Sequence, residues 1–363
     1  MKFPRCDYQL SKIMIGQVLE NEPADRAAAE AQQVIGAIAN DIQAGAWRED
    51  ANATSYLQDA LKSLRRLPRE AAAQARVECL LAGVGFLYVS GRTALGLEWV
   101  HEAVESARIL GSPQFLRRAL SNSGVLNADA GNFPASIEAY SEALEVAIAL
   151  KDARAEATVW LNLGPALMYA AQYVESIECS ERALAIAVRE GFGLPIIAAA
   201  PGNIALASLH LEDLAKGLRM AKRSVEAGDE PRNDVEKLNR VLHESTYTRL
   251  LLEVDSLAKA KERCELAKKY AQESSSEPAQ LVAAIAEGLY EVHAGLKDVG
   301  LSRLEKALDR ARGIKASLRD ALVAMVKGYE AAGEPEKALS YLRELMLHTR
   351  QAQQENVLYH HRL

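Results

Sequence analysis

The sequence predicts an all-α protein, an α-solenoid of stacked helical hairpins, and three observations support this fold class. The 363 residues are 49% apolar but only 6% aromatic, and a composition dominated by Ala and Leu favours helix packing over sheets. Apolar and small residues recur at spacings of 3, 4 and 7, as at Ser176, Ser180 and Ala183, which is the period of an amphipathic helix. Small residues also recur at the start of alternate predicted helices, in steps of 38 to 43 residues. These positions are Gly96, Ser136, Ser176, Gly217, Ala260, Gly300 and Ala338.

A period near 40 residues with two helices in each repeat is typical of a solenoid, in which each hairpin buries its apolar stripe against its neighbours. We expect about seven hairpins over residues 69–349. Their helix pairs are Arg69–Ser90 with Thr93–Leu110, Pro113–Ala130 with Phe133–Leu150, Arg154–Ala171 with Tyr173–Glu190, Pro195–Leu211 with Leu214–Ala227, Asn233–Val254 with Leu257–Gln272, Pro278–Ala294 with Val299–Gly313, and Lys315–Ala332 with Pro335–Thr349.

The two ends of the chain are expected to differ from the repeats. Residues 1–68 should form atypical capping helices over 24–44 and 52–67, because terminal repeats are usually irregular and Pro68 stops a helix. Residues 350–363 are polar. They should extend the last helix as a solvated tail or as a connector to a further domain.

The repeat pattern resembles the tetratricopeptide repeat family, which places small residues, an aromatic residue and an Ala at fixed positions. Matching residues are Gly124, Ser136, Tyr140 and Ala143, then Trp160, Leu163, Gly164, Leu167, Ser176 and Ala183, and later Gly288, Gly300, Ala307, Tyr329, Gly333 and Ala338. The usual period of this family is 34 residues, so the longer repeat is similar to the subgroup found in kinesin light chains, Gly–Asn-rich cell-polarity adaptors and bacterial peptide-sensing regulators. The resemblance implies a right-handed superhelix that binds proteins or peptides.

Three asparagines occupy one place in consecutive repeats. Asn122, Asn162 and Asn203 each lie two residues before the small residue of a predicted first helix. First helices line the concave wall of such a superhelix, and an amide can both donate to and accept from a peptide backbone. The resemblance implies peptide contact here, because this position binds peptide backbone in long-repeat relatives. The alternative is that each amide bonds a neighbouring helix and stiffens the array.

The same register places further polar residues on the predicted wall. Arg118 lies one turn before Asn122, and Arg249 lies three residues after Thr246, which takes the place of the asparagine. Either guanidinium could pair with a peptide carboxylate. The last inward-facing places of the first helices are held by Asp129, Tyr169, His210, Glu253 and His293. The alternative is a solvated wall without a ligand.

Two prolines, Pro165 and Pro201, lie inside predicted first helices of adjacent repeats. Each lacks a backbone N–H and should kink or interrupt its helix, which could widen the groove locally. For Pro201 the alternative is that its helix begins later than drawn.

Other classes of function receive little support. A net charge of −6 argues against a general nucleic-acid binder, and no apolar run of about 18 residues predicts a membrane span. The N-terminus does not resemble a signal peptide, and four dispersed cysteines without a CxxC pair fit a reducing compartment such as the cytoplasm. No hydrolase, phosphate-loop, dinucleotide or zinc-protease motif is present, so we expect no enzyme and no cofactor. His348, His360 and His361 are expected to lie on a solvated helix rather than at a metal site.

We therefore expect a non-catalytic scaffold or sensor that binds an extended protein segment or signalling peptide in a concave groove. Binding could regulate a fused or partner signalling domain. The competing hypothesis is self-association, as a homodimer through a terminal repeat or the C-terminal helix. The sequence does not identify the partner, the oligomeric state or the curvature of the superhelix.

Overall fold

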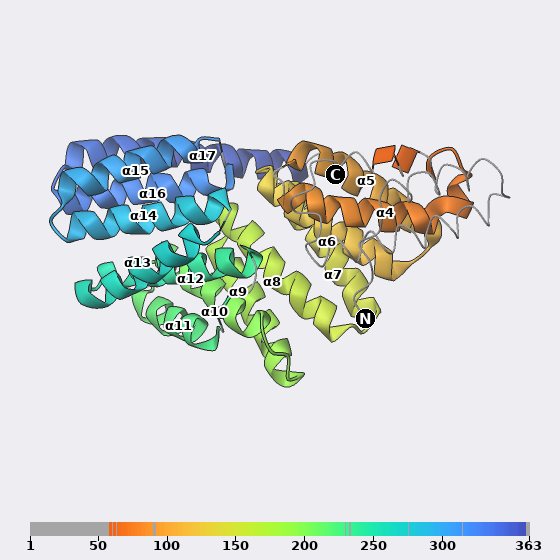
Figure 1. Ribbon diagram of the computed structural model, residues 1–363, viewed down its shortest axis with the longest axis horizontal. Coiled ribbons are helices and arrows are strands. Elements are labelled where there is room, and N and C mark those ends of the chain that lie inside the picture. The colour runs from red at the N-terminus through yellow and green to blue at the C-terminus, as the bar shows by residue number, and fades with distance from the viewer. Residues whose placement is uncertain are drawn as a thin grey trace. The chain divides into compact units, whose positions relative to one another are not determined.

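The computed structural model describes residues 58–360, except residues 60, 63, 90, 91, 229, 232, 233, 275 and 314. Within this part of the chain every regular element is a helix (Figure 1), so the all-α prediction is confirmed. The helix expected over 24–44, most of that expected over 52–67, and His361 lie outside the described residues.

The helices begin and end within a few residues of the predicted bounds, and the last helix continues through the expected polar extension to His360. They are α4 (Arg69–Val89), α5 (Thr93–Leu110), α6 (Pro113–Asp129), α7 (Phe133–Ala149), α8 (Ala153–Tyr169), α9 (Tyr173–Arg189), α10 (Ile196–His210), α11 (Leu214–Ala227), α12 (Asp234–Leu252), α13 (Leu257–Gln272), α14 (Glu277–His293), α15 (Lys297–Ala311), α16 (Lys315–Ala332) and α17 (Pro335–His360).

The chain forms two compact units. The first comprises residues 1–130 and 138–151 and, in its described part, contains α4, α5, α6 and most of α7. The second comprises residues 131–137 and 152–363 and contains the first turn of α7 together with α8 to α17.

Small residues recur because the two helices of a hairpin approach each other closely at these positions. In the hairpin of α14 and α15, a Cβ atom on Gly300 would lie 2.5 Å from the carbonyl oxygen of Gly288 and 2.8 Å from the backbone nitrogen of Val292. In the hairpin of α8 and α9, a Cβ atom on Gly164 would lie 3.3 Å from the carbonyl oxygen of Ser176. A larger side chain would therefore force the helices apart.

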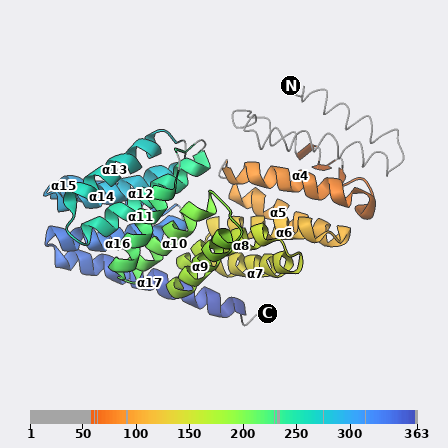
Figure 2. The same ribbon diagram turned by 90° about the horizontal axis from the view of Figure 1, so that it is seen from below.

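The first helices of consecutive hairpins form an inner layer in the second unit. Contacts link α8 to α10, α10 to α12, α12 to α14 and α14 to α16 (Figure 2). One core cluster extends from α12 to α17 and includes Leu281, Leu304 and Met325, all nearly inaccessible to solvent. Burial of these apolar side chains fixes the inner helices, and thereby the residues that face away from the core.

Pro165 and Pro201 lie inside α8 and α10, as predicted. The alternative for Pro201 is wrong, because α10 begins at Ile196 and contains it. Of the described helices, none has the length and apolar character that a membrane crossing needs.

Candidate functional site

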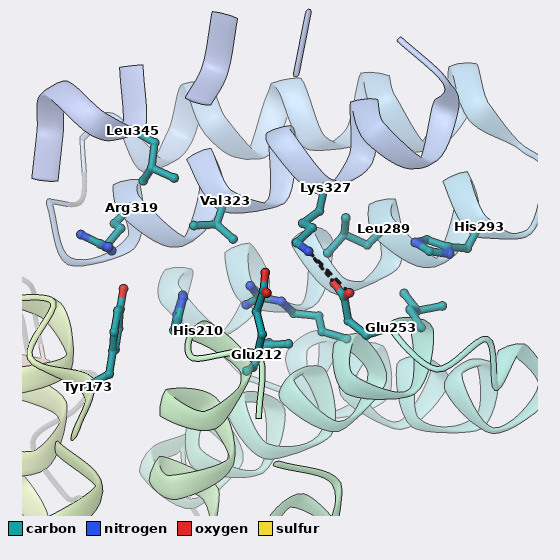
Figure 3. A pocket seen from close by; sticks show the side chains of 13 residues that line it. Tyr173, His210, Glu212, Glu253, Leu289, His293, Arg319, Val323, Lys327 and Leu345 are labelled. Atoms are coloured by element: carbon teal, nitrogen blue, oxygen red, sulfur yellow. Dashed lines mark hydrogen bonds and ion pairs between the residues drawn. The ribbon is translucent and has the colours of Figure 1, made fainter. Parts of the chain in front are cut away.

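The second unit contains a cavity of about 210 Å³ lined by side chains from α10, α12, α14 and α16, with additional residues from α9 and α17 (Figure 3). Its charged and aromatic lining residues are Tyr173, His210, Glu212, Arg249, Glu253, His293, Arg319 and Lys327. A smaller cavity of about 40 Å³ shares His210 and Arg319 with it and is also lined by Tyr169 and Asp320. The inner layer therefore brings polar groups from several hairpins to one place.

Asp320 on α16 connects this helix to α12 and α10. Nη1 of Arg249 donates to Oδ1 of Asp320 at 2.7 Å, and Nε2 of His210 lies 4.0 Å from the same oxygen. Burial by itself would raise the pKa of the Asp320 carboxyl, but Arg249 and His210 outweigh burial and lower this pKa below its usual value. Burial also lowers the pKa of His210 to about 4. At neutral pH the cluster therefore contains an ion pair beside a neutral imidazole.

An aromatic platform lies beside this cluster. The ring of Tyr173, at the start of α9, stacks on His210 with ring centroids 4.8 Å apart and an interplanar angle of 11°. The guanidinium of Arg319 lies 5.5 Å from the centroid of the Tyr173 ring, and its Nη1 donates to Oγ1 of Thr349 at 2.9 Å. Burial raises the pKa of the Tyr173 hydroxyl, and the charge of Arg319 partly offsets this rise.

A second ion pair lies toward the other end of the cavity. Nζ of Lys327 is 3.4 Å from Oε1 of Glu253, and Figure 3 shows Glu212 near this pair, away from Tyr173 and Arg319. Glu212 is solvent-exposed and occupies a turn position with φ 58°. The cavity therefore has Arg319 beside Tyr173 at one end, while Glu212 and Glu253 lie beside Lys327 farther along it.

The amide of Asn203 has a structural partner. Pro165 has no N–H, so the carbonyl of Leu161, four residues earlier, lacks its usual donor within α8. Nδ2 of Asn203 donates to this carbonyl at 3.3 Å and thereby ties α10 to α8. Asn162 is half-buried on α8, and its side chain makes no hydrogen bond to another residue in the described ranges. For Asn203, a hydrogen bond to a neighbouring helix is thus observed; peptide contact by the two amides stays a prediction.

Three of the predicted site residues belong to the first unit, all on α6. Asn122 is half-buried. Arg118 is exposed and lies over the ring of Phe115 at 5.8 Å. Asp129 is exposed and accepts a hydrogen bond from the hydroxyl of Thr93. Whether the amide of Asn122 lines up with the other two stays a prediction.

The remaining predicted residues belong to the second unit. His210, Arg249, Glu253 and His293 line the larger cavity, while Tyr169 lines the smaller one and packs against Phe133 with ring centroids 5.8 Å apart. The hydroxyl of Thr246 donates to the carbonyl of Leu242 in its own helix. Arg249, which could pair with a peptide carboxylate, donates from its Nη1 to the carboxylate of Asp320; its contact with a peptide stays a prediction.

Sequence reasoning missed Tyr173, Arg319 and Asp320. Tyr173 begins a second helix, whereas the register considered only first helices. Arg319 and Asp320 lie early in α16, more than one turn before the asparagine place. The available signal was an adjacent Arg and Asp in the first turns of a helix whose later part is largely apolar.

Comparisons with known proteins identify the fold. No protein-family model matches the chain, and no curated protein matches it. Several solved structures do. The structure described as a Rap protein complexed with Competence and Sporulation Factor is 14% identical, with a TM-score of 0.69 over 96% of this chain and 99% of that chain. The Rap conjugation gene regulator of plasmid pLS20, in complex with the Phr* peptide, is 13% identical, with a TM-score of 0.66 over 97% and 98%. Aspartyl phosphate phosphatase F from Bacillus subtilis is 13% identical, with a TM-score of 0.61 over 98% and 97%.

The chain is a solenoid of the tetratricopeptide-repeat type. At this level of identity the likeness establishes the fold and leaves the function to be argued from the site.

Proposed function

We propose that this helical-repeat protein is a binding module whose second unit takes an extended protein segment or a signalling peptide against α10, α12, α14 and α16. The observation that carries the proposal is the larger cavity, to which each of the four inner helices contributes both polar and apolar side chains. Ligand pockets combine placed polar groups with apolar surface, and this cavity has both, with charged and aromatic residues in the majority. Two of the structural neighbours are described in complex with Competence and Sporulation Factor and with the Phr* peptide, which supports the same class of ligand here.

The volume of the cavity limits what enters it. At about 210 Å³ it is smaller than the roughly 300–1,000 Å³ of pockets that enclose a whole small ligand. It therefore suits one or two side chains of a ligand whose backbone runs outside it. In this arrangement the stacked rings of Tyr173 and His210 provide an apolar surface. Asn162 lies on the neighbouring helix α8 and lines neither cavity, so contact of its amide with the ligand backbone stays a prediction. Arg249 is assigned a supporting role, because it holds Asp320.

We propose binding without catalysis. A catalytic site needs a nucleophile or base aimed at a substrate position, with a second group that orients it. Here the imidazole of His210 is stacked on Tyr173, and the carboxylate of Asp320 is engaged by Arg249. Both groups are thus engaged by other residues of the protein.

The experiment is a binding selection with a synthetic heptapeptide library on the purified full chain, followed by titration of the enriched peptides. Val323 lines the cavity, so Val323→Phe should fill it and abolish binding. The matched control is Val299→Phe, because Val299 is exposed on α15. Enrichment of no peptide, or unchanged binding by a folded Val323→Phe variant, would refute the proposal.

A second candidate function is self-association through α17. Four apolar residues near the middle of this helix are between 38% and 60% exposed: Leu339, Leu342, Met346 and Leu347. The spacing of Leu339, Leu342 and Met346 places them on one helix face. Light scattering after size-exclusion chromatography tests this function. If the wild type is a dimer, Leu342→Glu should lower the measured molar mass toward that of the monomer. A monomer at every concentration would remove this candidate.

A further inference from the structure

We propose that the cavity of the second unit selects ligands by a carboxylate group, and that Arg319 is the residue that binds it. This inference rests on the proposed function and specifies the chemistry of its ligand. It follows from the distribution of charges around the cavity, from the way Arg319 is held and from the polarity of its surroundings.

The cations of the cavity differ in whether a carboxylate of the protein already holds them. Three lining residues carry a positive charge: Arg249, Arg319 and Lys327. Arg249 is neutralised by Asp320 at 2.7 Å, and Lys327 lies 3.4 Å from Glu253. Arg319 has no carboxylate within ion-pair distance anywhere in the described ranges. A ligand anion would have to displace an existing partner at the other two residues, but not at Arg319.

The guanidinium of Arg319 has hydrogen-bond donors in two different situations. Its Nη1 donates to the hydroxyl of Thr349, whereas its Nε is buried and has no acceptor among the described residues. A buried donor without an acceptor is costly, and more so when the group is charged. The chain therefore leaves this guanidinium only partly satisfied, beside a cavity that a ligand can enter.

The guanidinium of Arg319 is preorganised. Thr349 fixes one end of it, and Tyr173 lies against it, with 5.5 Å between the guanidinium carbon and the ring centroid. An arginine held in this way loses little conformational freedom when it binds, and its planar fork matches a carboxylate. The neighbouring His210 is neutral, because burial lowers its pKa to about 4, so it does not compete for the anion.

The two acidic residues that line the cavity, Glu212 and Glu253, lie apart from Arg319. Figure 3 shows Glu212 midway along the lining, beside Lys327 and Glu253 and away from Tyr173 and Arg319. A carboxylate that enters beside Tyr173 thus reaches Arg319 without passing between Glu212 and Glu253. The ligand carboxylate could be an Asp or Glu side chain or the free C-terminus of a peptide, and the two sources are distinguished below.

The test uses peptides enriched from the heptapeptide library and measures fluorescence polarisation with the wild-type chain. Each peptide is compared with its C-terminal amide and with versions in which Asp or Glu is replaced by Asn or Gln. Loss of one carboxylate should weaken binding about 10- to 100-fold, the range expected for a charge-assisted hydrogen bond. The version of the peptide that binds more weakly, the C-terminal amide or the Asn or Gln replacement, identifies the source of the carboxylate.

The protein variants are Arg319→Gln and the matched control Arg343→Gln, since Arg343 is an exposed arginine on α17 outside the cavity. Arg319→Gln should weaken the carboxylate peptides about 10- to 100-fold while the neutral versions bind as before, and Arg343→Gln should change neither. Equal binding of charged and neutral peptides by the wild type would overturn the inference while leaving the proposed function intact. So would an equal loss of both kinds of peptide in Arg319→Gln. The absence of any binding peptide would refute the proposed function itself.

Discussion

The substitution Asp320→Asn should destabilise the second unit, because it removes the anion that holds α12 and α16 together. The side chain of Arg249 is only 8% exposed, so its charge would remain buried after the substitution. The new amide oxygen could still accept a hydrogen bond, but it would not balance this charge. His210, which is neutral in the folded protein, cannot supply the missing negative charge.

The expected magnitude follows from the burial of the two partners. Removing one partner of a fully buried ion pair costs about 3 to 5 kcal/mol, whereas an exposed pair contributes under about 1 kcal/mol. The side chain of Asp320 retains 22% exposure, so water can partly solvate the uncompensated charge. We therefore expect a loss at the lower end, about 3 kcal/mol in the free energy of unfolding.

Denaturation with guanidinium chloride, followed by far-ultraviolet circular dichroism, measures this loss. The matched control is Asp309→Asn, because Asp309 is exposed on α15; it should leave the unfolding midpoint unchanged. The double variant Arg249→Met, Asp320→Leu removes both charges and should recover much of the stability. A loss below about 1 kcal/mol for Asp320→Asn would refute the reasoning, because the pair would then behave as a surface pair.

Three further predictions concern the same fold. Lowering the pH from 7 to 5 should reduce the free energy of unfolding by about 2 kcal/mol for each of His210 and His243, because unfolded histidine takes up a proton in this range. The cause is burial, which holds the pKa of both near 4 in the folded protein. Denaturation at both pH values measures the loss. If His243→Gln lost as much free energy of unfolding between pH 7 and pH 5 as the wild type, this reasoning would be contradicted. Gly300→Ala should destabilise the protein by more than about 2 kcal/mol, because the new methyl group would overlap with the backbone of α14. Gly85→Ala should instead stabilise it by about 0.5 to 1 kcal/mol, because a Cβ atom at this position of α4 would meet no neighbouring atom. Equal shifts of the denaturation midpoint would show that the close approach of the helices does not matter. Asn203→Ala should cost about 1 kcal/mol of stability through its lost hydrogen bond to α8. Unchanged unfolding would contradict a stabilising role for this hydrogen bond.

The fold could be predicted because its constraints are local and repeated. Residues such as Ser176 and Gly300 must be small wherever two helix backbones approach, so their spacing in the sequence gives the repeat and the helix pairs. The same register gave His210 and Arg249 a place on the inner face, because residues in equivalent places of successive first helices face the same way.

The partners of these residues could not be predicted in this way. Arg249 and Asp320 are 71 residues apart, and they meet because small rotations between successive hairpins add up. A periodic pattern does not specify these rotations. The bond of Asn203 was hidden for another reason. Its acceptor, the carbonyl of Leu161, is available only because a proline lies four residues farther along the neighbouring helix.

Pro165 of α8 limits how the repeat array can be shortened or transferred to another protein. In a repeat protein a single hairpin is the usual module of exchange, but the backbone bonding of α8 is completed by a side chain from the next hairpin. Deleting residues 196–227 would expose an acceptor that no atom of α8 itself can serve. The smallest transferable cassette in this region is therefore two hairpins, residues 153–227, unless Pro165 is first exchanged for a residue that carries its own backbone donor.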